Sequence, residues 1–404
     1  MDAVSIIIFC AIALFALALL WIEGLLKYSR FFLTALLCIA AAFVLRALCM
    51  NHVTLDYEDF LSVWVDFFRK NGGFAALSRS IGNYNVPYLY FLALFSYSDT
   101  SALYLIKLLS ILFDVLLAWA AMKLVGTATK SSVRKLFVFL AVLLLPTVIL
   151  NSAYWGQCDS IYVSLGLIAL WLALSDRPAL SVVFIALSFS FKLQAVFLMP
   201  IYLVFLFSGR IRFRHLFLFP ATYVVVVLPA VLAGRPFIDT ITLYFDQAGT
   251  VGSALNYNSP SAFALLHGNV DEKLFSYIGI GCAFLFCVIV FIALFFRRRS
   301  LSNRLLIAAA LLFAVGVPFL LPHMHDRYFY AADVLSLSLA VVSPWLFPVP
   351  VCVSFASLLG YHAYLRMRYL LPMRYGSFAL IIALVLTIVY MSVCVHQRKH
   401  SSGR

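Results

Sequence analysis

Four short polar segments interrupt an apolar sequence, and the first of them could supply a general base. It begins at Asp56, places three carboxylates within four residues through Glu58 and Asp59, and continues to Trp64. A carboxylate directly after a membrane helix could accept the proton of a hydroxyl group, so Asp56 and Asp59 are candidate catalytic residues. The same acids also fit the start of an amphipathic helix, where a carboxylate caps free backbone N–H groups. The sequence leaves both interpretations open.

The second segment, residues 151–160, combines groups that commonly bind sugar hydroxyls. It contains two aromatic rings, an amide and a carboxylate: Tyr154, Trp155, Gln157 and Asp159. An aromatic belt at the membrane surface explains Tyr154 and Trp155. It does not require the polar side chains beside them, so a site for a sugar or an acceptor is the alternative.

The third segment places one ionisable side chain, Lys192, between two apolar stretches. Stranding a charge in lipid costs about 2.5–3.5 kcal/mol on insertion scales, so such a group is a functional candidate by default. Its ammonium could hold a phosphate as a point charge. The alternative is a side chain that extends from a short helix end to the membrane surface.

The fourth segment, residues 322–330, contains two histidines, a carboxylate and a guanidinium in five consecutive positions. His323, His325 and Asp326 could bind a divalent metal, but three ligands in one turn usually cannot face one ion. We therefore favour no metal and expect no cofactor. Arg327 suits the bidentate binding of a phosphate. An ordinary polar turn with an Asp326–Arg327 ion pair is the alternative.

The composition of the chain places these segments in a membrane protein. Of the 404 residues, 65% are hydrophobic and 11% are charged, whereas soluble proteins average about 45–50% apolar and about 25% charged residues. A soluble enzyme is therefore excluded. The formal net charge of +13 comes from basic residues that cluster in short breaks between apolar runs, as the positive-inside rule predicts for cytoplasmic loops. Membrane orientation explains this charge without a nucleic-acid partner.

The apolar runs predict one all-α membrane domain over residues 1–404, a polytopic bundle of about 11–13 transmembrane helices. They lack the alternation with a period of two that barrel strands require. Residues 86–98 are apolar but too short for a span, which favours an interfacial or re-entrant segment. The candidate spans are 4–22, 31–50, 101–124, 136–150, 160–174, 179–192, 194–208, 216–233, 274–296, 305–321, 328–346, 349–364 and 376–395.

If the basic clusters face the cytoplasm, the four polar segments all come out on the opposite, acidic face. The connections expected there hold ten of the sixteen acidic residues: 51–85, 151–159, 234–273 and 322–327. Long connections without a domain of their own are usually functional. We therefore expect 51–85 to be an external catalytic loop with amphipathic helices and 234–273 to be a second external loop. Arg366, Arg368 and Arg374 fall on this face against the rule.

Taken together, these segments resemble the GT-C superfamily of membrane glycosyltransferases, and most closely the bacterial mannosyltransferase-like proteins related to the GPI second-mannose transferase family. The resemblance extends over roughly residues 50–330. The elements that carry it are Asp56 with Trp64, Asn83-Tyr84-Asn85-Val86-Pro87-Tyr88-Leu89-Tyr90, Tyr154-Trp155-Gly156-Gln157-Cys158-Asp159-Ser160, Phe191-Lys192-Leu193-Gln194 and Met324-His325-Asp326-Arg327-Tyr328-Phe329.

The resemblance implies an inverting transfer of a sugar, a mannose-like hexose above all, from a polyprenyl-phosphate-linked donor. The acceptor would be an envelope glycan or lipid on the extracytoplasmic face of the cell membrane. Asp56 would be the general base, with Asp59 as the second choice. The donor phosphate would lie near Lys192, His325 and Arg327, and the sugar or acceptor near Trp64, Tyr154, Trp155, Gln157 and Asp159.

This sequence departs from the family pattern in two places. Asp326 stands where glutamate is more common, and a proline pair is reduced to Val86-Pro87. A lipid-linked sugar flippase or transporter is the rival class, but it predicts inverted repeats and charges near the midplane. A membrane polysaccharide polymerase is a further alternative, although a larger external loop is expected for it.

Overall fold

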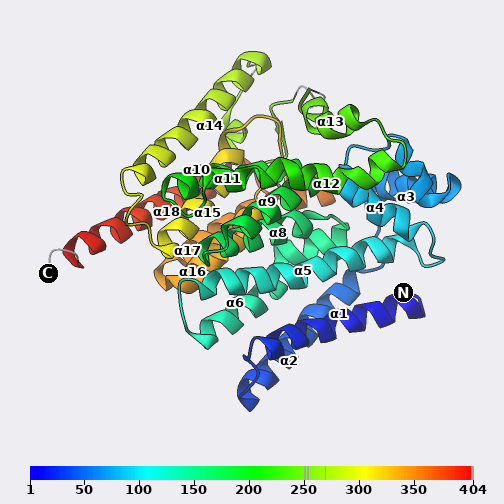
Figure 1. Ribbon diagram of the computed structural model, residues 1–404, viewed down its shortest axis with the longest axis horizontal. Coiled ribbons are helices and arrows are strands. Elements are labelled where there is room, and N and C mark those ends of the chain that lie inside the picture. Colours follow the sequence, from blue (N-terminus) through cyan, green and yellow to red (C-terminus); the bar gives the residue numbers. More distant parts are fainter. Residues whose placement is uncertain (250–251, 253, 269, 402–404) are drawn as a thin grey trace.

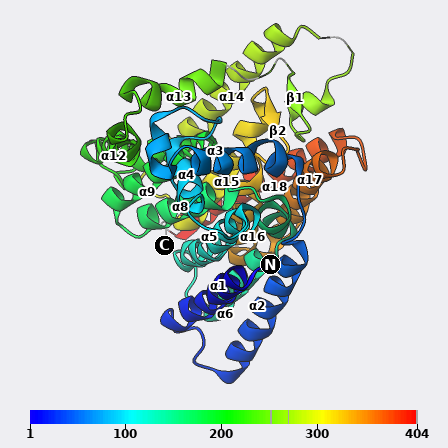
Figure 2. The same cartoon turned by 90° about the vertical axis from the view of Figure 1, so that its right-hand side faces the viewer.

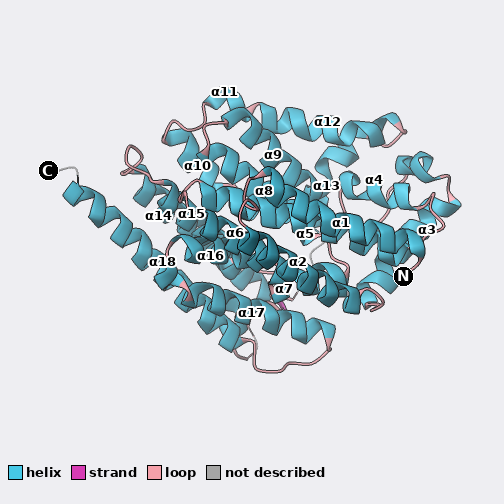
Figure 3. Ribbon diagram, turned by 90° about the horizontal axis from the view of Figure 1, so that it is seen from below, coloured by secondary structure: helices cyan, strands magenta, loops and turns pink. Residues whose placement is uncertain are grey.

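The computed structural model describes residues 1–401 except 250, 251, 253 and 269. Helices make up 76% of the chain, and the described strands are two short ones (Figure 3). The fold is the predicted all-α bundle of a polytopic membrane protein.

The first two helices form a pair at one side of the bundle (Figures 1 and 2). α1 (Ala3–Ile22) is capped by the Asp2 carboxylate, which accepts from the Ser5 backbone N–H at 2.8 Å. α2 (Ser29–Cys49) returns along it, and the pair packs on α5 (Ala102–Gly126) and α6 (Ser132–Leu144). Most of their apolar side chains stay exposed, as lipid-facing helices require.

Short elements follow α2 at one end of the bundle: η1 (Tyr57–Leu61), α3 (Ser62–Lys70), η2 (Gly73–Ser78) and α4 (Val86–Phe95). α3 is amphipathic and buries Trp64, Val65 and Phe68. α4 starts at the capping residue Asn85 and has ten residues, or about 15 Å, which is too short to cross a bilayer.

The centre of the molecule is α5, which packs along both α6 and α8 (Asp159–Leu174). Between them lie α7 (Pro146–Ile149) and η3 (Leu150–Trp155). The chain bends by 46° between α6 and α7, because Pro146 has no backbone N–H to continue the helix. The bend turns residues 151–159 back toward the start of α5.

The next helices are α9 (Pro178–Phe191), η4 (Leu193–Leu198), α10 (Pro200–Phe207), α11 (Phe213–Leu216), α12 (Leu218–Leu232) and α13 (Phe237–Gly249). Lys192 separates α9 from η4 in an extended conformation, with φ −154°. It is therefore the residue at which the helix is broken.

The last part of the chain contains α14 (Glu272–Phe295), α15 (Asn303–Leu320), α16 (Tyr330–Val342), η6 (Pro344–Leu346), α17 (Pro348–Leu365) and α18 (Arg374–Ser401). Two connections in this part are tied together by a parallel strand pair, β1 (Asn256–Tyr257) with β2 (Met324–His325). η5 (Ala262–Leu265) lies between β1 and α14. The pair joins the predicted second external loop to the histidine-rich segment.

All thirteen predicted apolar runs are helical, but they differ in length. Among the described residues, eight helices are long and apolar enough to cross a membrane, or nine if the bent α6–α7 pair counts as one span. The other predicted runs are shorter helices: α8, α9, α10 with η4, and α16. α8 and α16 are buried at nearly every position, so they fill the interior rather than face lipid.

Four of these helices connect two ends of the molecule. α5 has 25 residues, or about 37 Å. The N-termini of α5 and α8 and the C-terminus of α9 lie at one end of the bundle. α15 starts at the opposite end, beside the C-termini of α5 and α8, and runs toward the first. In Figure 1 the short helices α3 and α4 mark this end on the right, while the C-terminus lies on the left.

Candidate functional site

The carboxylate of Asp56 is the centre of the site. Its Oδ2 accepts hydrogen bonds from Trp155 Nε1 at 2.7 Å and Gln157 Nε2 at 2.6 Å, and its Oδ1 accepts from the Tyr364 hydroxyl at 2.6 Å. All three donors are neutral. They hold the half-buried carboxylate in one orientation, and its remaining lone pairs can still accept a proton.

The turn that carries Asp56 is stabilised by Lys107 of α5. The Lys107 ammonium donates to the backbone oxygens of Cys49, Met50 and His52 at 3.0, 3.2 and 2.6 Å, and so caps the C-terminal end of α2. Thr54 then donates to the backbone oxygen of Trp155 at 3.0 Å. These bonds connect the first polar segment to the second.

Backbone geometry brings Trp155 and Gln157 to the same oxygen. Gly156 lies between them with φ +80°, in the left-handed region where a side chain would be strained. The chain therefore reverses direction, and the Gln157 backbone N–H donates to the Asn151 backbone oxygen at 2.9 Å. Trp155 is fully buried, stacked on Tyr364 with 4.8 Å between ring centroids.

A second carboxylate, Asp159 at the start of α8, holds the cationic part of the site. It accepts from Lys192 Nζ at 2.5 Å on Oδ1 and from Asn151 Nδ2 at 2.8 Å on Oδ2. Arg327 Nε lies 3.7 Å from Asp159 Oδ2, and its guanidinium lies 5.4 Å from the centroid of the Trp155 ring. One carboxylate is thus shared by two cations, and Asp326 Oδ1 also lies 3.9 Å from Arg327 Nη1.

The histidine-rich segment reaches this cluster through the strand pair. The His325 ring stacks on Tyr257 at 4.8 Å. Burial, with the nearby Arg327 and Lys192 charges, lowers the pKa of His325 to about 4, so its imidazole is neutral at pH 7. Burial raises the pKa of Asp326 to about 7, against the opposing effect of Arg327. Asp326 is therefore only partly ionised at neutral pH.

Several buried polar atoms around the cluster have no hydrogen-bond partner. They are Asn151 Oδ1, Gln194 Oε1, Asp326 Oδ1 and Arg327 Nε. An unmade buried hydrogen bond costs about 1–3 kcal/mol. Four such atoms beside one cationic cluster indicate a site whose polar groups are completed by a ligand.

Six predicted residues converge on this site: Asp56, Trp155, Gln157, Asp159, Lys192 and Arg327. His325 lies at its border. Asp59 instead is exposed on η1, outside the network around Asp56. Tyr154 stacks on the His52 ring at 3.7 Å. Trp64 is buried and contacts the Tyr84 ring edge-on at 5.5 Å, so it reaches the site only through Tyr84.

The sequence reasoning missed the tyrosines of the site. Tyr364 lies at the end of α17, where an aromatic residue suggests only the membrane surface. Tyr84 donates to Gln157 Oε1 at 3.2 Å, and Lys192 Nζ lies 5.6 Å from its ring centroid. Tyr84 stands in the segment 83–90, which carries part of the resemblance to the family, and that resemblance was the available sign of its role.

Asp114 and Lys107, which share one face of α5, have different partners. Asp114 pairs with Arg46 at 2.8 Å, with both side chains fully buried, and accepts from Ser152 at 2.6 Å. Lys107 instead donates hydrogen bonds to the backbone carbonyl groups at the C-terminal end of α2.

The histidines are not arranged as metal ligands. His323 Nδ1 lies 2.8 Å from the backbone oxygen of Ala254, and its Nε2 lies 3.1 Å from Ser276 Oγ. Within the described part of the chain, no group of three or more His, Cys, Asp or Glu side chains could hold a metal ion.

The fold and the site together define a polytopic membrane protein that gathers carboxylates, cations and aromatic rings at one end of its helix bundle. The profile of Glycosyltransferase family 87 matches residues 83–322, more than half of the chain. The protein belongs to this family and is a membrane glycosyltransferase. No curated protein matches the sequence. The matched region includes Trp155, Asp159 and Lys192, and it excludes Asp56 and Arg327.

Proposed function

We propose that the protein transfers a mannose-like hexose from a polyprenyl-phosphate-linked donor to a glycan or lipid acceptor on the extracytoplasmic face of the cell membrane. The observation that carries the proposal is the Asp56 carboxylate, oriented by three neutral donors beside the Lys192–Asp159–Arg327 cluster. An inverting transfer needs a base and a phosphate-binding group in one site, on opposite sides of the sugar.

Asp56 is the proposed general base. The acceptor oxygen attacks the anomeric carbon from the face opposite the phosphate, and Asp56 takes the acceptor's proton as the new bond forms. The bond from the anomeric carbon to the phosphate oxygen breaks, and its electron pair leaves with the lipid phosphate. The configuration at the anomeric carbon is inverted. The bonds from Trp155, Gln157 and Tyr364 keep the base aimed while the proton moves.

Lys192 and Arg327 are the proposed phosphate-binding groups. The leaving phosphate gains charge in the transition state, and fixed cations stabilise it there more than in the ground state. Asp159 holds both cations in place, and the Asp326 carboxyl, 3.9 Å from Arg327 and only partly ionised at neutral pH, offsets part of the second charge. The unpartnered Nε of Arg327 supplies a ready donor. His325 borders this subsite as a neutral ring.

The sugar or acceptor would lie against the aromatic and amide groups of the same end. Trp155 and Gln157 are buried and would support this subsite by holding Asp56, and Asp159 borders it through the cationic cluster. Trp64 would act by supporting Tyr84. Tyr154 lies farther out against His52 and would contact only the acceptor.

Charge distribution supports the extracytoplasmic placement. Arginine clusters lie at the opposite ends of α5, α8, α9 and α15, where the positive-inside rule places the cytoplasm. The proposed site then opens at the outer leaflet. A long prenyl chain can remain in the bilayer while its phosphate enters that site.

The test is transfer from a radiolabelled polyprenyl-phosphate sugar in membranes that contain the full-length protein. We expect Asp56→Asn to lower the rate by about 10²–10⁴-fold, the usual contribution of a positioned base. Asp66→Asn is the matched control, because its carboxylate is exposed and its ion pair within the described residues is with Arg69 on α3. A flippase would tolerate Asp56→Asn, so full activity in that variant rejects the proposal.

Asp59→Asn distinguishes the second candidate base. Because Asp59 is exposed and outside the network, we expect this variant to keep its activity. Loss of transfer with Asp59→Asn but not with Asp56→Asn would assign the base to Asp59. A ladder of products that grows by many sugars from one acceptor would favour a polymerase.

A further inference from the structure

The end of the bundle opposite Asp56 contains a connected series of cavities lined by arginines. One cavity of about 770 Å³ includes five of them: Arg210, Arg212, Arg214, Arg298 and Arg299. A second, of about 360 Å³, shares Arg210 with it and adds Arg304. A third, of about 310 Å³, shares Arg304 with the second. We refer to these six arginines with Arg134 as the arginine end.

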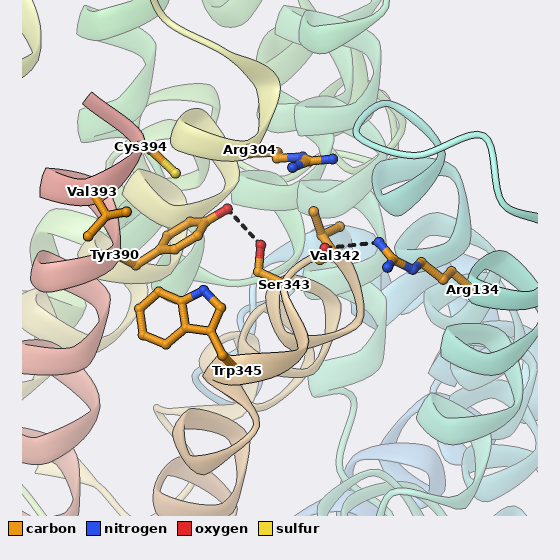
Figure 4. A pocket seen from close by; sticks show the side chains of 8 residues that line it. All are labelled: Arg134, Arg304, Val342, Ser343, Trp345, Tyr390, Val393 and Cys394. Atoms are coloured by element: carbon orange, nitrogen blue, oxygen red, sulfur yellow. Dashed lines mark hydrogen bonds between the residues drawn. The ribbon is translucent and has the colours of Figure 1, made fainter. Parts of the chain in front are cut away.

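The third cavity differs from the other two because aromatic side chains line it together with two guanidinium groups (Figure 4). Arg134 and Arg304 point toward it from α6 and α15. The Tyr390 hydroxyl and Ser343 Oγ are joined at 2.8 Å, and the Trp345 ring lies 5.6 Å from the Tyr390 ring. Arginine, hydroxyl and indole donors therefore face one space.

The two guanidinium groups of this cavity lack a carboxylate partner. Arg134 donates one N–H to the backbone oxygen of Val342 at 3.1 Å, which leaves its other donors available. In the part of the chain that the structure describes, no aspartate or glutamate lines the cavity. Across the described residues, neither Arg134 nor Arg304 takes part in an ion pair. Paired guanidinium groups with free donors are suited to a phosphate-class anion.

The surface beside the cavity indicates where such an anion comes from. One face of α18 carries an exposed apolar stripe at helical spacing that ends at the cavity: Phe378, Ile382, Val385, Val389 and Val393. The stripe runs about 22 Å along the helix, close to the length of an acyl chain. Trp345 is 52% exposed at the same level, which is typical of the membrane interface.

We propose that the cavity between Arg134 and Arg304 binds the phosphodiester headgroup of an anionic phospholipid, with an acyl chain along the α18 stripe. The site lies one helix length from Asp56 and is separate from the donor site. The lipid belongs to the leaflet opposite the one that supplies the sugar donor. Its headgroup connects α6, α15 and α18, which all contribute residues to the cavity.

A general attraction of basic loops to anionic lipid is the competing explanation. It depends on the number of charges and not on their position. Arg304 and Arg214 provide a matched pair for separating the two, because both are exposed and both line a cavity of the arginine end. Of these two arginines, only Arg304 lines the cavity that contains Trp345 and Tyr390.

The experiment is lipid binding to the purified full-length protein in detergent, measured by native mass spectrometry with dioleoyl-phosphatidylglycerol as the probe. We expect Arg304→Gln to weaken binding by about tenfold, as loss of a charged hydrogen-bond donor predicts. We expect Arg214→Gln to change it by less than about twofold, as for a surface charge. Equal losses in the two variants overturn the proposal.

Two further measurements identify the ligand and the apolar contact. Dioleoyl-phosphatidylcholine, which is zwitterionic, is expected to bind more weakly than phosphatidylglycerol. Inorganic phosphate in molar excess is expected not to displace the lipid, and displacement by phosphate alone would instead assign the cavity to a soluble anion. Val393→Ser should weaken lipid binding without changing inorganic phosphate binding, because it interrupts the stripe and leaves both arginines in place. Unchanged lipid binding in Val393→Ser overturns the acyl-chain contact.

Discussion

The two ends of the bundle use charged side chains in opposite ways. At the Asp56 end, Lys192 and Asp159 are buried, with 8% and 1% of their side chains exposed, and each has a defined partner. At the arginine end, Arg212, Arg214 and Arg299 are exposed and are not ion-paired within the described residues. The same helices connect both ends, so residue type alone does not decide the role. Burial and partners decide it.

Physical chemistry explains why the difference matters. A buried ion pair is sensitive to the loss of either member, because the remaining charge stays desolvated and costs about 3–5 kcal/mol. An exposed arginine loses little, since water replaces its partner. The comparison therefore predicts large effects at one end and small effects at the other for identical substitutions.

The largest expected effect comes from Arg327→Gln compared with Arg212→Gln. Arg327 lies against Asp159 and Trp155 with an unpartnered Nε, so its loss should lower kcat/KM by about 10²–10³-fold, as for other transition-state charge donors. Arg212 is exposed at the other end, and its variant should stay within about twofold of the parent. The measurement is transfer kinetics with the donor varied. Similar losses in both variants would remove the distinction between the ends.

A smaller effect is expected from Tyr364→Phe. This substitution removes one of three hydrogen bonds to Asp56 and keeps the ring that stacks on Trp155. Loss of one hydrogen bond to a charged group predicts about a tenfold lower kcat, because the base is less well positioned. The donor KM should not change, since Tyr364 does not contact the phosphate-binding groups.

Two comparisons complete the Tyr364 test. Tyr361→Phe is the comparison, because Tyr361 also packs on Trp155 but its hydroxyl accepts from Asn151 at 3.4 Å, on the Asp159 side of the site, and donates no bond to Asp56. A parallel rise in donor KM for Tyr364→Phe would mean that the tyrosine acts through the whole site and not through the base.

The sequence predicted the helices better than it predicted the partners within the site. Long apolar runs determine helices locally, and all thirteen were found as helical segments. Lys192 and Asp159 were identified because charge in an apolar chain is conspicuous. Their pairing depends on how α8 and α9 pack, which no local pattern encodes. Tyr364 was missed for the same reason, since it lies more than 300 residues from Asp56.

The predicted lengths of the spans show a related limit. Hydropathy identifies α8 and α16 as apolar but cannot tell a helix that faces lipid from one that other helices surround. Because both helices are almost completely buried among other helices, they do not need the length that crossing a bilayer requires. The sequence therefore located these helices without showing that they form the interior.

The smallest expected effect is a dependence on pH through Asp326. Its pKa is raised to about 7 by burial, so the carboxyl group is mainly neutral below pH 7 and becomes an anion beside Arg327 as the pH rises through that value. The new negative charge reduces the attraction of the cluster for a phosphate. We expect the donor KM to rise a few-fold between about pH 6 and 8, and Asp326→Asn to abolish that rise.

The stability of the fold should follow the same titration. An acid whose pKa is higher in the folded state than its ordinary value of 3.8 binds more protons when folded, so its contribution is lost as the pH rises toward about 7. His325, with a folded pKa of about 4, acts in the opposite direction, gaining stability from about pH 4 to 6.5. Both the parent and Asp326→Asn carry His325, so their difference reports Asp326 alone: the variant should be increasingly stabilised as the pH rises from about 4 to about 7, and most at and above pH 7. A thermal-unfolding difference between Asp326→Asn and the parent that does not vary with pH would contradict this assignment. Among the described residues, no carboxyl group of this kind lines the cavity between Arg134 and Arg304. Lipid binding at the arginine end should therefore not change over the same pH range.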